Sequence, residues 1–163
     1  MAPVDLKGFY AYLLWSREAL EGVSEEALER PLVPRKRLKS VKALLLHTAV
    51  EDAWLHEERT SSGPPWSSPV SRRWRACPGR YQEAVGRATG AFLQGPVDED
   101  QVVALHDAPE ERYPLGDLLW HASLHEARHG AQVALLLRVL GQEPPALDLY
   151  FFLKAKGGQG EVL

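Results

Sequence analysis

The chain has 163 residues, of which 45% are apolar and 25% are charged, and its formal net charge at pH 7 is −3. This length and composition are typical of one globular domain with a sizeable core, and they exclude two full domains and intrinsic disorder. A mildly acidic chain offers no broad positive field to nucleic acid or to an anionic membrane. Its longest apolar run, residues 9–15, is too short to span a bilayer. We therefore expect a cytoplasmic protein that binds neither nucleic acid nor a membrane.

The first third of the chain contains two predicted helices. Apolar residues recur at helical spacing between residues 4 and 22, which predicts the first helix. Residues 23–38 are interrupted by two prolines and are expected to form a connection with one short turn beginning at Ser24. The second helix is expected from residue 40 to residue 59, with Ser40 as its N-cap.

Two further helices are predicted after a long loop. Residues 60–77 are rich in glycine, proline and serine, a composition that forms neither helix nor strand well. Pro78 suits the first position of a third helix, which would end at about residue 93. The longest periodic run extends from residue 114 to residue 140, and Gly141 is expected to end this fourth helix in a left-handed conformation.

These elements predict an all-α fold. No segment alternates convincingly between apolar and polar residues, so we expect no sheet. Four long helices indicate a four-helix bundle, and the loop of residues 60–77 is long enough to cross the length of a helix. This crossover permits helices 2 and 3 to run parallel, in an up-down-down-up topology. Residues 149–153 are expected to pack back on the body before a flexible tail at about residues 155–163, so that residues 1–163 form a single domain.

Histidines are the most informative residues of the chain. His121, His125 and His129 are spaced four residues apart on the fourth predicted helix, so neighbours project from one face and can share a metal ion. His47 is the obvious third donor, because it lies in a leucine run that should face the core, where bundles build their ligand sites. A lone buried histidine is usually a structural residue. Burying several without partners would cost about 1–3 kcal/mol for each unsatisfied group, which favours a metal site.

The ligands of such a site must be nitrogen or oxygen atoms. Cys77 is the only cysteine of the chain, so a thiolate cage and an internal disulfide are both excluded.

Three stretches of sequence resemble a known family. They are LLLHTAVEDAWL at residues 44–55, LLWHASLHEARHGAQ at residues 118–132 and LRVLGQEPPALD at residues 137–148. Together they make the chain similar, over nearly its whole length, to the DinB/YfiT-like superfamily of metalloenzymes. The resemblance implies an up-down-down-up four-helix bundle.

The same resemblance implies a set of metal ligands. The family holds its metal with one histidine of the second helix and two of a His-x-x-x-His motif on the last helix. These positions match His47, His125 and His129. His121 stands where the family often has a histidine that is not counted among the ligands, and it is the reserve candidate.

The chain departs from the family pattern after the last histidine. Members often read His-Arg-Gly-Gln where residues 129–132 here are His-Gly-Ala-Gln, so the basic residue is missing. Arg128 is adjacent but lies about 100° away around the helix. Gln132 is retained and is a candidate to orient a ligand or to act in catalysis.

Three neutral imidazoles would leave one to three coordination positions open, as in a catalytic site. Zinc and nickel both suit imidazole ligands, and we name zinc first. Such an ion would lower the pKa of bound water or deprotonate a bound thiol. Some relatives look like thiol-dependent transferases. The resemblance therefore implies an S-transferase that joins a low-molecular-weight thiol, as cofactor, to a small electrophilic substrate.

Two other functions stay open at this stage. A metal-dependent hydrolase using metal-bound water would need a general base, for which Glu51 and Glu126 are candidates, although both also fit as partners of a ligand. A non-catalytic stress-response module with a metal site is the third reading. Relatives are often dimers, and residues 149–153 could serve a homodimer or close the core of one monomer.

Overall fold

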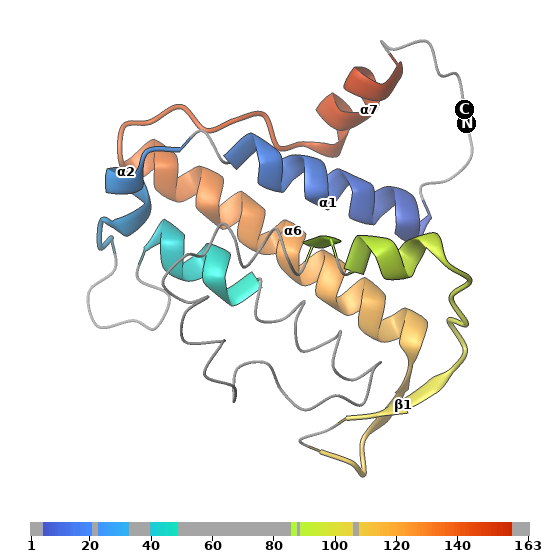
Figure 1. The fold of residues 1–163 in the computed structure, drawn as a ribbon. Helices are drawn as coiled ribbons and strands as arrows, with labels where there is room; N and C mark the ends of the chain where they lie inside the picture. The colour runs from blue at the N-terminus through green and yellow to red at the C-terminus, as the bar shows by residue number, and fades with distance from the viewer. Residues whose placement is uncertain are drawn as a thin grey trace.

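The computed structural model describes residues 5–20, 23–32, 40–48, 86–87, 89–105 and 108–157. These residues are mostly helical, with one small antiparallel sheet. The long helix α6 (Leu115–Val139) runs through the molecule, and α1 (Leu6–Leu20) lies along it (Figure 1). Within the described ranges, no helix is long and apolar enough to cross a membrane.

Helix α1 confirms the first predicted helix and packs one apolar face on α6. The backbone N–H of Gly8 donates to Oδ1 of Asp5 at 2.7 Å, which satisfies an amide of the first turn. Buried residues then recur at intervals of four, three and seven positions along α1, which places them on one helix face. Their cluster with α6 comprises Leu6, Tyr10, Leu13, Leu115, Leu118, Leu119 and Ala122.

Two serines start the next helices, as their sequence context predicts. The N–H of Ala27 donates to Oγ of Ser24 at 3.3 Å at the start of α2 (Glu25–Glu29). Likewise, the N–H of Ala43 donates to Oγ of Ser40 at 3.2 Å at the start of a helix that covers residues 41–48. The predicted continuation of this helix to residue 59 lies outside the described residues.

The helix of residues 41–48 is joined to α1 and α6 by a second apolar cluster. Val41 and Val133 are almost completely buried in it, with 0% and 1% of their surface exposed. This cluster comprises Leu20, Ala27, Val41, Leu44, Val133 and Leu137. It brings the helix that carries His47 against the C-terminal half of α6.

Only the end of the third predicted helix is described. Residues 86–87 and 89–94 are helical, and the helix stops before Gly95, as expected. Its predicted start at Pro78 and the loop of residues 60–77 lie outside the described residues.

A two-stranded sheet corrects the expectation of a sheetless fold. β1 (Val102–Ala104) pairs antiparallel with β2 (Arg112–Pro114), and Val103 faces Tyr113 in the register. Each strand has three residues and Val103 alone is buried, so there is no alternating pattern for a sequence to display. The pairing is continued by the N–H of Leu115, which donates to the carbonyl of Gln101 at 2.8 Å. Backbone bonding next to α6 and the burial of Val103 in the cluster of α1 and α6 hold this hairpin.

The C-terminal part of the chain folds back over α1. Gly141 ends α6 with a φ of 76°, a left-handed conformation that glycine adopts without strain, so this prediction is confirmed. Residues 142–148, here called the strap, then lead to α7 (Leu149–Gly157). Phe152 of α7 is buried against the rings of Tyr12 and Trp15, with centroid distances of 5.9 and 5.8 Å. The apolar segment thus helps to close the core of one monomer. Residues 155–157, expected at the start of the tail, are the last turn of α7, and residues 158–163 lie outside the described residues.

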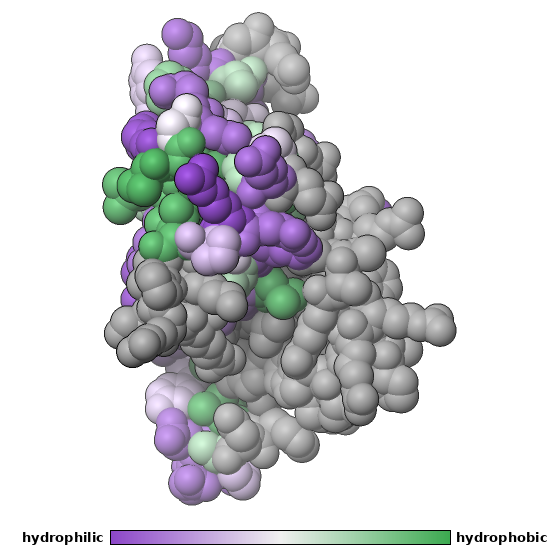
Figure 2. All heavy atoms as spheres, turned by 90° about the vertical axis from the view of Figure 1, so that its left-hand side faces the viewer, coloured by the Kyte–Doolittle hydropathy of each residue, from purple (hydrophilic) through white to green (hydrophobic). Residues whose placement is uncertain are grey.

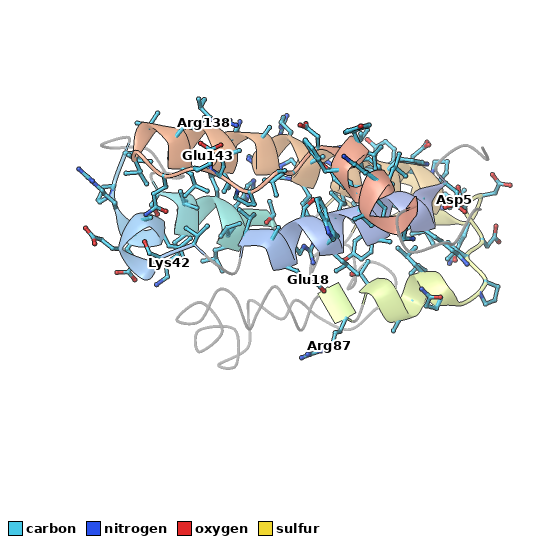
Figure 3. The ribbon with its side chains drawn as sticks, turned by 90° about the horizontal axis from the view of Figure 1, so that it is seen from above. Asp5, Glu18, Lys42, Arg87, Arg138 and Glu143 are labelled. Carbon is cyan, nitrogen blue, oxygen red and sulfur yellow. The ribbon has the colours of Figure 1, made fainter. Side chains whose placement is uncertain are left out.

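The outer surface mixes charged and apolar side chains. Asp5, Glu18 and Arg87, which are labelled in Figure 3, are all exposed. Apolar groups stand beside hydrophilic ones on the face drawn in Figure 2. On α6, three large apolar residues are more than half exposed, namely Leu124, Leu135 and Val139.

Candidate metal centre

The structure brings His47, His125 and His129 together. His47 comes from the helix of residues 41–48, and the other two lie one turn apart on α6. The ring centroid of His47 is 5.0 Å from that of His125 and 4.9 Å from that of His129, and the latter two are 4.4 Å apart. One nitrogen from each ring can be chosen so that all three lie within 4.8 Å of one another. The three side chains therefore converge on one point.

His121, the reserve candidate, lies outside this group. Its ring stacks on that of His125 with a centroid distance of 6.0 Å, and its side chain is exposed. It therefore neighbours the cluster without joining the three donors that face one another.

The proton on His129 is located by its partner. Nδ1 of His129 donates to Oε1 of Gln132 at 2.7 Å, since an amide oxygen only accepts hydrogen bonds. The neutral ring then carries its lone pair on Nε2, which lies 3.1 Å from Nε2 of His125. Gln132 therefore contacts a candidate ligand and orients its ring, which is the role that hydrogen-bond partners of metal-bound histidines have.

His125 is held in its neutral form. Burial, and then the charges of His129, His47, Arg128 and His121, lower the pKa of His125 to about 4. Its Nδ1 is also buried and has no hydrogen-bond partner in the described part of the chain. The charged imidazolium would carry two N–H donors in this setting, so the neutral ring with a free lone pair is favoured.

The donor set fits a divalent transition metal. Two nitrogens bound to one zinc ion at about 2.0–2.1 Å each, in tetrahedral geometry, lie about 3.4 Å apart. The separation of 3.1 Å between the two Nε2 atoms is close to this value. Imidazole nitrogens suit zinc and nickel, and a cluster of three leaves coordination positions for other molecules. The described residues can therefore hold a metal ion.

Glu126, a candidate general base, lies in a different environment from the histidines. Its Oε1 and Oε2 accept from Nε and Nη2 of Arg17, each at 2.5 Å, in a two-pronged ion pair. The two side chains are only 10% and 11% exposed. A carboxylate whose oxygens both bind a guanidinium is poorly placed to take a proton from a substrate. Glu51, the other candidate base, lies outside the described residues.

Arg17 was not singled out from the sequence, although a signal was present. It falls on the same face of α1 as Tyr10, Leu13 and Leu20, which are all buried. Its guanidinium lies 5.7 Å from the ring centroid of Tyr10. A Cβ atom at Gly86 would come within 2.7 Å of Nη1 of Arg17, so a glycine at this position lets the arginine pack against the neighbouring helix. A charged residue such as Arg17 on an otherwise apolar helix face indicates that a residue of opposite charge is buried next to it.

Comparison with known proteins identifies the relatives of the chain. The family model described as the DinB family matches residues 3–161. No curated protein matches the chain. The resemblance drawn from the histidine-bearing stretches is confirmed by this family match.

Proposed function

This chain belongs to the DinB family, whose model matches residues 3–161, and we propose that it is a metal-dependent S-transferase that joins a low-molecular-weight thiol to a small electrophile. The observation that carries the proposal is the convergence of His47, His125 and His129 within 4.8 Å. A site with three neutral donors leaves room for a thiol beside the ion.

In this proposal the three histidines hold one divalent ion, with zinc first and nickel second. When bound, the ion would supply positive charge that lowers the pKa of a thiol at an open position and favours its reactive thiolate form. The protein would contribute neutral donors, since the pKa of His125 is lowered to about 4. Gln132 would hold His129 with its Nε2 directed to the ion.

The proposal includes the fold that surrounds the site. We propose that α1, α6 and the helices containing residues 41–48 and 86–94 form an up-down-down-up bundle, with residues 60–77 crossing between the two middle helices. It is supported by the apolar clusters that join α1 to α6 and join both to residues 41–48. An experimental structure that resolves residues 49–85 tests this topology directly.

A metal-dependent hydrolase is the second candidate, and the ion pair weighs against it. Hydrolysis would require a general base, and both oxygens of Glu126 are engaged by Arg17. The third candidate, a non-catalytic stress-response module, would bind metal without turning over either class of substrate.

The decisive experiment measures metal content and activity together. Protein purified without a histidine tag should contain one equivalent of metal. His47→Ala and His125→Ala should each lower zinc affinity by more than about 100-fold, because removing a metal ligand weakens binding more than removing the hydrogen-bond partner of a ligand does. His121→Ala is the matched control and should bind zinc like the wild type. Stoichiometric metal that survives both substitutions would contradict the assignment.

The activity assay uses small thiols and 1-chloro-2,4-dinitrobenzene as the chromogenic electrophile. Conjugation that requires both metal and His125 supports the transferase. Ester or amide hydrolysis without a thiol supports the hydrolase, and metal binding with neither activity supports the module.

We also propose that the protein acts on small molecules in the cytoplasm, as a homodimer, without nucleic acid or membrane partners. Leu124, Leu135 and Val139 support a contact between copies, because they are exposed apolar residues on one side of α6. Sedimentation should give a dimer that Leu135→Glu dissociates, whereas a monomeric wild type would contradict this assembly.

A further inference from the structure

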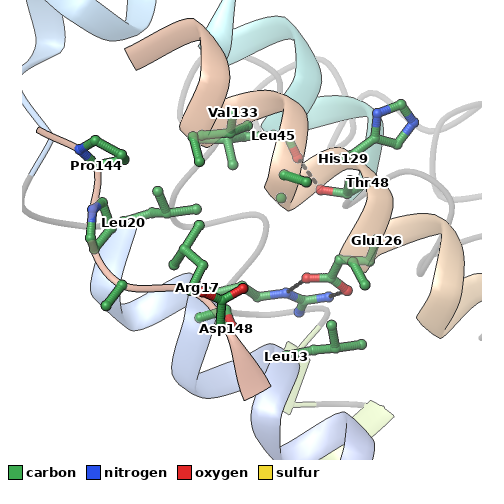
Figure 4. Close-up of a pocket in the computed structure, with 18 of the residues that line it drawn as sticks. Leu13, Arg17, Leu20, Leu45, Thr48, Glu126, His129, Val133, Pro144 and Asp148 are labelled. Atoms are coloured by element: carbon green, nitrogen blue, oxygen red, sulfur yellow. Dashed lines mark hydrogen bonds and ion pairs between the residues drawn. The ribbon is translucent and has the colours of Figure 1, made fainter. Parts of the chain in front are cut away.

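A cavity of about 560 Å³ lies beside the metal centre, between α1, the helix of residues 41–48, α6 and the strap (Figure 4). It adjoins the cluster of histidines through one shared residue. His129 contributes to its wall, whereas His47 and His125 do not. In Figure 4 the ring of His129 points away from Arg17 and Pro144, which lie on other sides of the cavity. The cavity and the three donors thus lie on two sides of the same turn of α6.

The strap forms a fixed wall of the cavity. At its start, Nε2 of Gln142 donates to Oγ of Ser24 at 3.1 Å. Near its end, the hydroxyl of Tyr12 donates to the carbonyl of Leu147 at 2.7 Å. Between these two hydrogen bonds the strap contains two consecutive prolines, whose rings restrict the backbone. The cavity is therefore formed before any ligand binds, as small-molecule sites usually are.

Several polar side chains of the wall already have partners within the protein. Arg17 and Glu126 bind each other. The hydroxyl of Ser16 donates to the carbonyl of Tyr12 at 3.0 Å, and that of Thr48 donates to the carbonyl of Leu45 at 2.9 Å. A charged ligand would have to compete with these contacts.

Much of the remaining wall is aliphatic. Its larger members are Leu13, Leu20, Leu44, Leu45, Val133 and Leu147. Transfer of an apolar group from water to such a wall is favourable by about 25 cal/mol for each Å² of surface buried.

The charge of the cavity disfavours anions. Arg138, Glu143 and Asp148 are exposed residues of its lining, and the first two are labelled in Figure 3. Together with Arg17 and Glu126 they make two guanidinium groups against three carboxylates, a formal charge of −1. An anionic ligand would lose its hydration and face a lining of net negative charge.

We infer that this cavity binds a small uncharged molecule with an apolar body, at a site distinct from the metal centre. The volume of about 560 Å³ lies within the range of about 300–1,000 Å³ that small-molecule sites span. The inference rests on the wall of the cavity and is independent of the reaction proposed for the histidines.

Two matched probes test the inference on the full chain. N-phenyl-1-naphthylamine is neutral, and 1-anilinonaphthalene-8-sulfonate has the same ring system with an added sulfonate. Fluorescence titration should show saturable binding of one neutral probe per chain, at least about tenfold tighter than binding of the anionic probe. Equal or tighter binding of the sulfonate would overturn the inference.

Substitutions locate the probe. Ala134 lines the cavity, and Ala134→Phe should fill part of it and weaken binding of the neutral probe at least about tenfold. Ala131→Phe, at an exposed part of the wall, gives a second test with less risk to folding. Ala91→Phe is the control, because Ala91 is exposed on a helix and does not line the cavity. Unchanged binding in both cavity variants would refute the site.

The two proposals fail separately. His125→Ala should lose zinc affinity and keep the affinity for the neutral probe within about twofold, since His125 is not part of the cavity wall. Loss of probe binding in this variant would contradict a separate site, whereas loss of zinc alone agrees with it.

Discussion

Neighbouring residues of α6 lie in two contrasting environments. His125 faces two other imidazoles, and its Nδ1 is buried with no hydrogen-bond partner among the described residues. Glu126, the next residue, is buried with both oxygens bound to Arg17. The protein itself compensates the charge of Glu126, whereas His125 is kept neutral and faces the rings of His47 and His129.

This difference separates a structural polar group from a candidate binding group. A buried charge with a two-pronged partner is satisfied and has little capacity left for a ligand. Lone pairs of neutral imidazoles that converge on one point gain most from a shared cation. The contrast can be tested by removing the carboxylate of the ion pair and, separately, the hydrogen-bond partner of a histidine.

The largest effect is expected for the ion pair. Glu126→Ala should lower the free energy of unfolding by about 3–5 kcal/mol, because it leaves the guanidinium of Arg17 buried without its carboxylate. Urea denaturation measures this loss. Arg17→Met combined with Glu126→Leu should recover most of it, since an apolar pair of similar volume needs no charge compensation.

The matched control for this prediction is a surface pair. Nζ of Lys42 lies 2.5 Å from Oε1 of Glu29, and the Glu29 side chain is 58% exposed. Glu29→Ala should cost at most about 1 kcal/mol, because water screens exposed ion pairs. A loss for Glu126→Ala no greater than that for Glu29→Ala would show that the buried pair has no special role.

The second largest effect is expected at Gln132, and it concerns the zinc affinity of the histidine cluster. Gln132→Ala should weaken zinc binding about tenfold, because His129 loses the acceptor that fixes its Nδ1–H. Gln132→Glu keeps an acceptor and should retain the affinity. Competition with a chromophoric chelator measures both, and Gln101→Ala, at an exposed position before β1, is the control. Wild-type affinity in Gln132→Ala would remove this residue from the site.

A smaller effect, dependent on pH, is expected at Tyr12. Burial is the main cause that raises the pKa of Tyr12 above its ordinary value of 10.0. The folded state therefore keeps the phenolic proton of Tyr12 to higher pH than the unfolded state does. The stability that this protonated hydroxyl contributes is fully present below pH 10 and is lost as pH rises through the pKa of the folded state. Tyr12→Phe should cost about 1 kcal/mol at pH 7, where the hydroxyl donates to Leu147.

Denaturation at several pH values checks this prediction. Stability should fall less steeply above pH 10 in Tyr12→Phe than in the wild type. Tyr150→Phe changes a tyrosine that is 65% exposed and should leave the pH dependence intact. Parallel pH profiles for the wild type and Tyr12→Phe would contradict the assignment.

The smallest effect concerns a buried hydroxyl with no partner. Thr89 is 1% exposed, and its Oγ1 makes no hydrogen bond within the described residues. Thr89→Val keeps the shape and should raise the free energy of unfolding by up to about 1 kcal/mol. Thr48→Val should lower it instead, because the Thr48 hydroxyl donates to Leu45. Destabilisation by Thr89→Val would mean that its hydroxyl has a role in the fold.

Much of the helical structure was predictable because its signals are local. The fourth predicted helix, residues 114–140, agrees with α6 to within one residue at each end. Ser40 marks a helix start through the hydrogen bond that its hydroxyl accepts from the N–H of Ala43, and Gly141 marks a helix end through its positive φ. The β1–β2 hairpin was missed, since strands of three residues with one buried side chain are too short to show an alternating pattern.

The sequence by itself determined the helices α1 and α6 and that His125 and His129 share a face of α6, because helical spacing depends on residues close in the chain. The leucine run around His47 made it the candidate third donor, but only the tertiary structure brings it to His125 and His129 and pairs Arg17 with Glu126. That pair joins residues 109 positions apart. The cavity likewise depends on how the strap crosses α1. Such contacts follow from how helices pack, and no local pattern specifies which of several faces will meet.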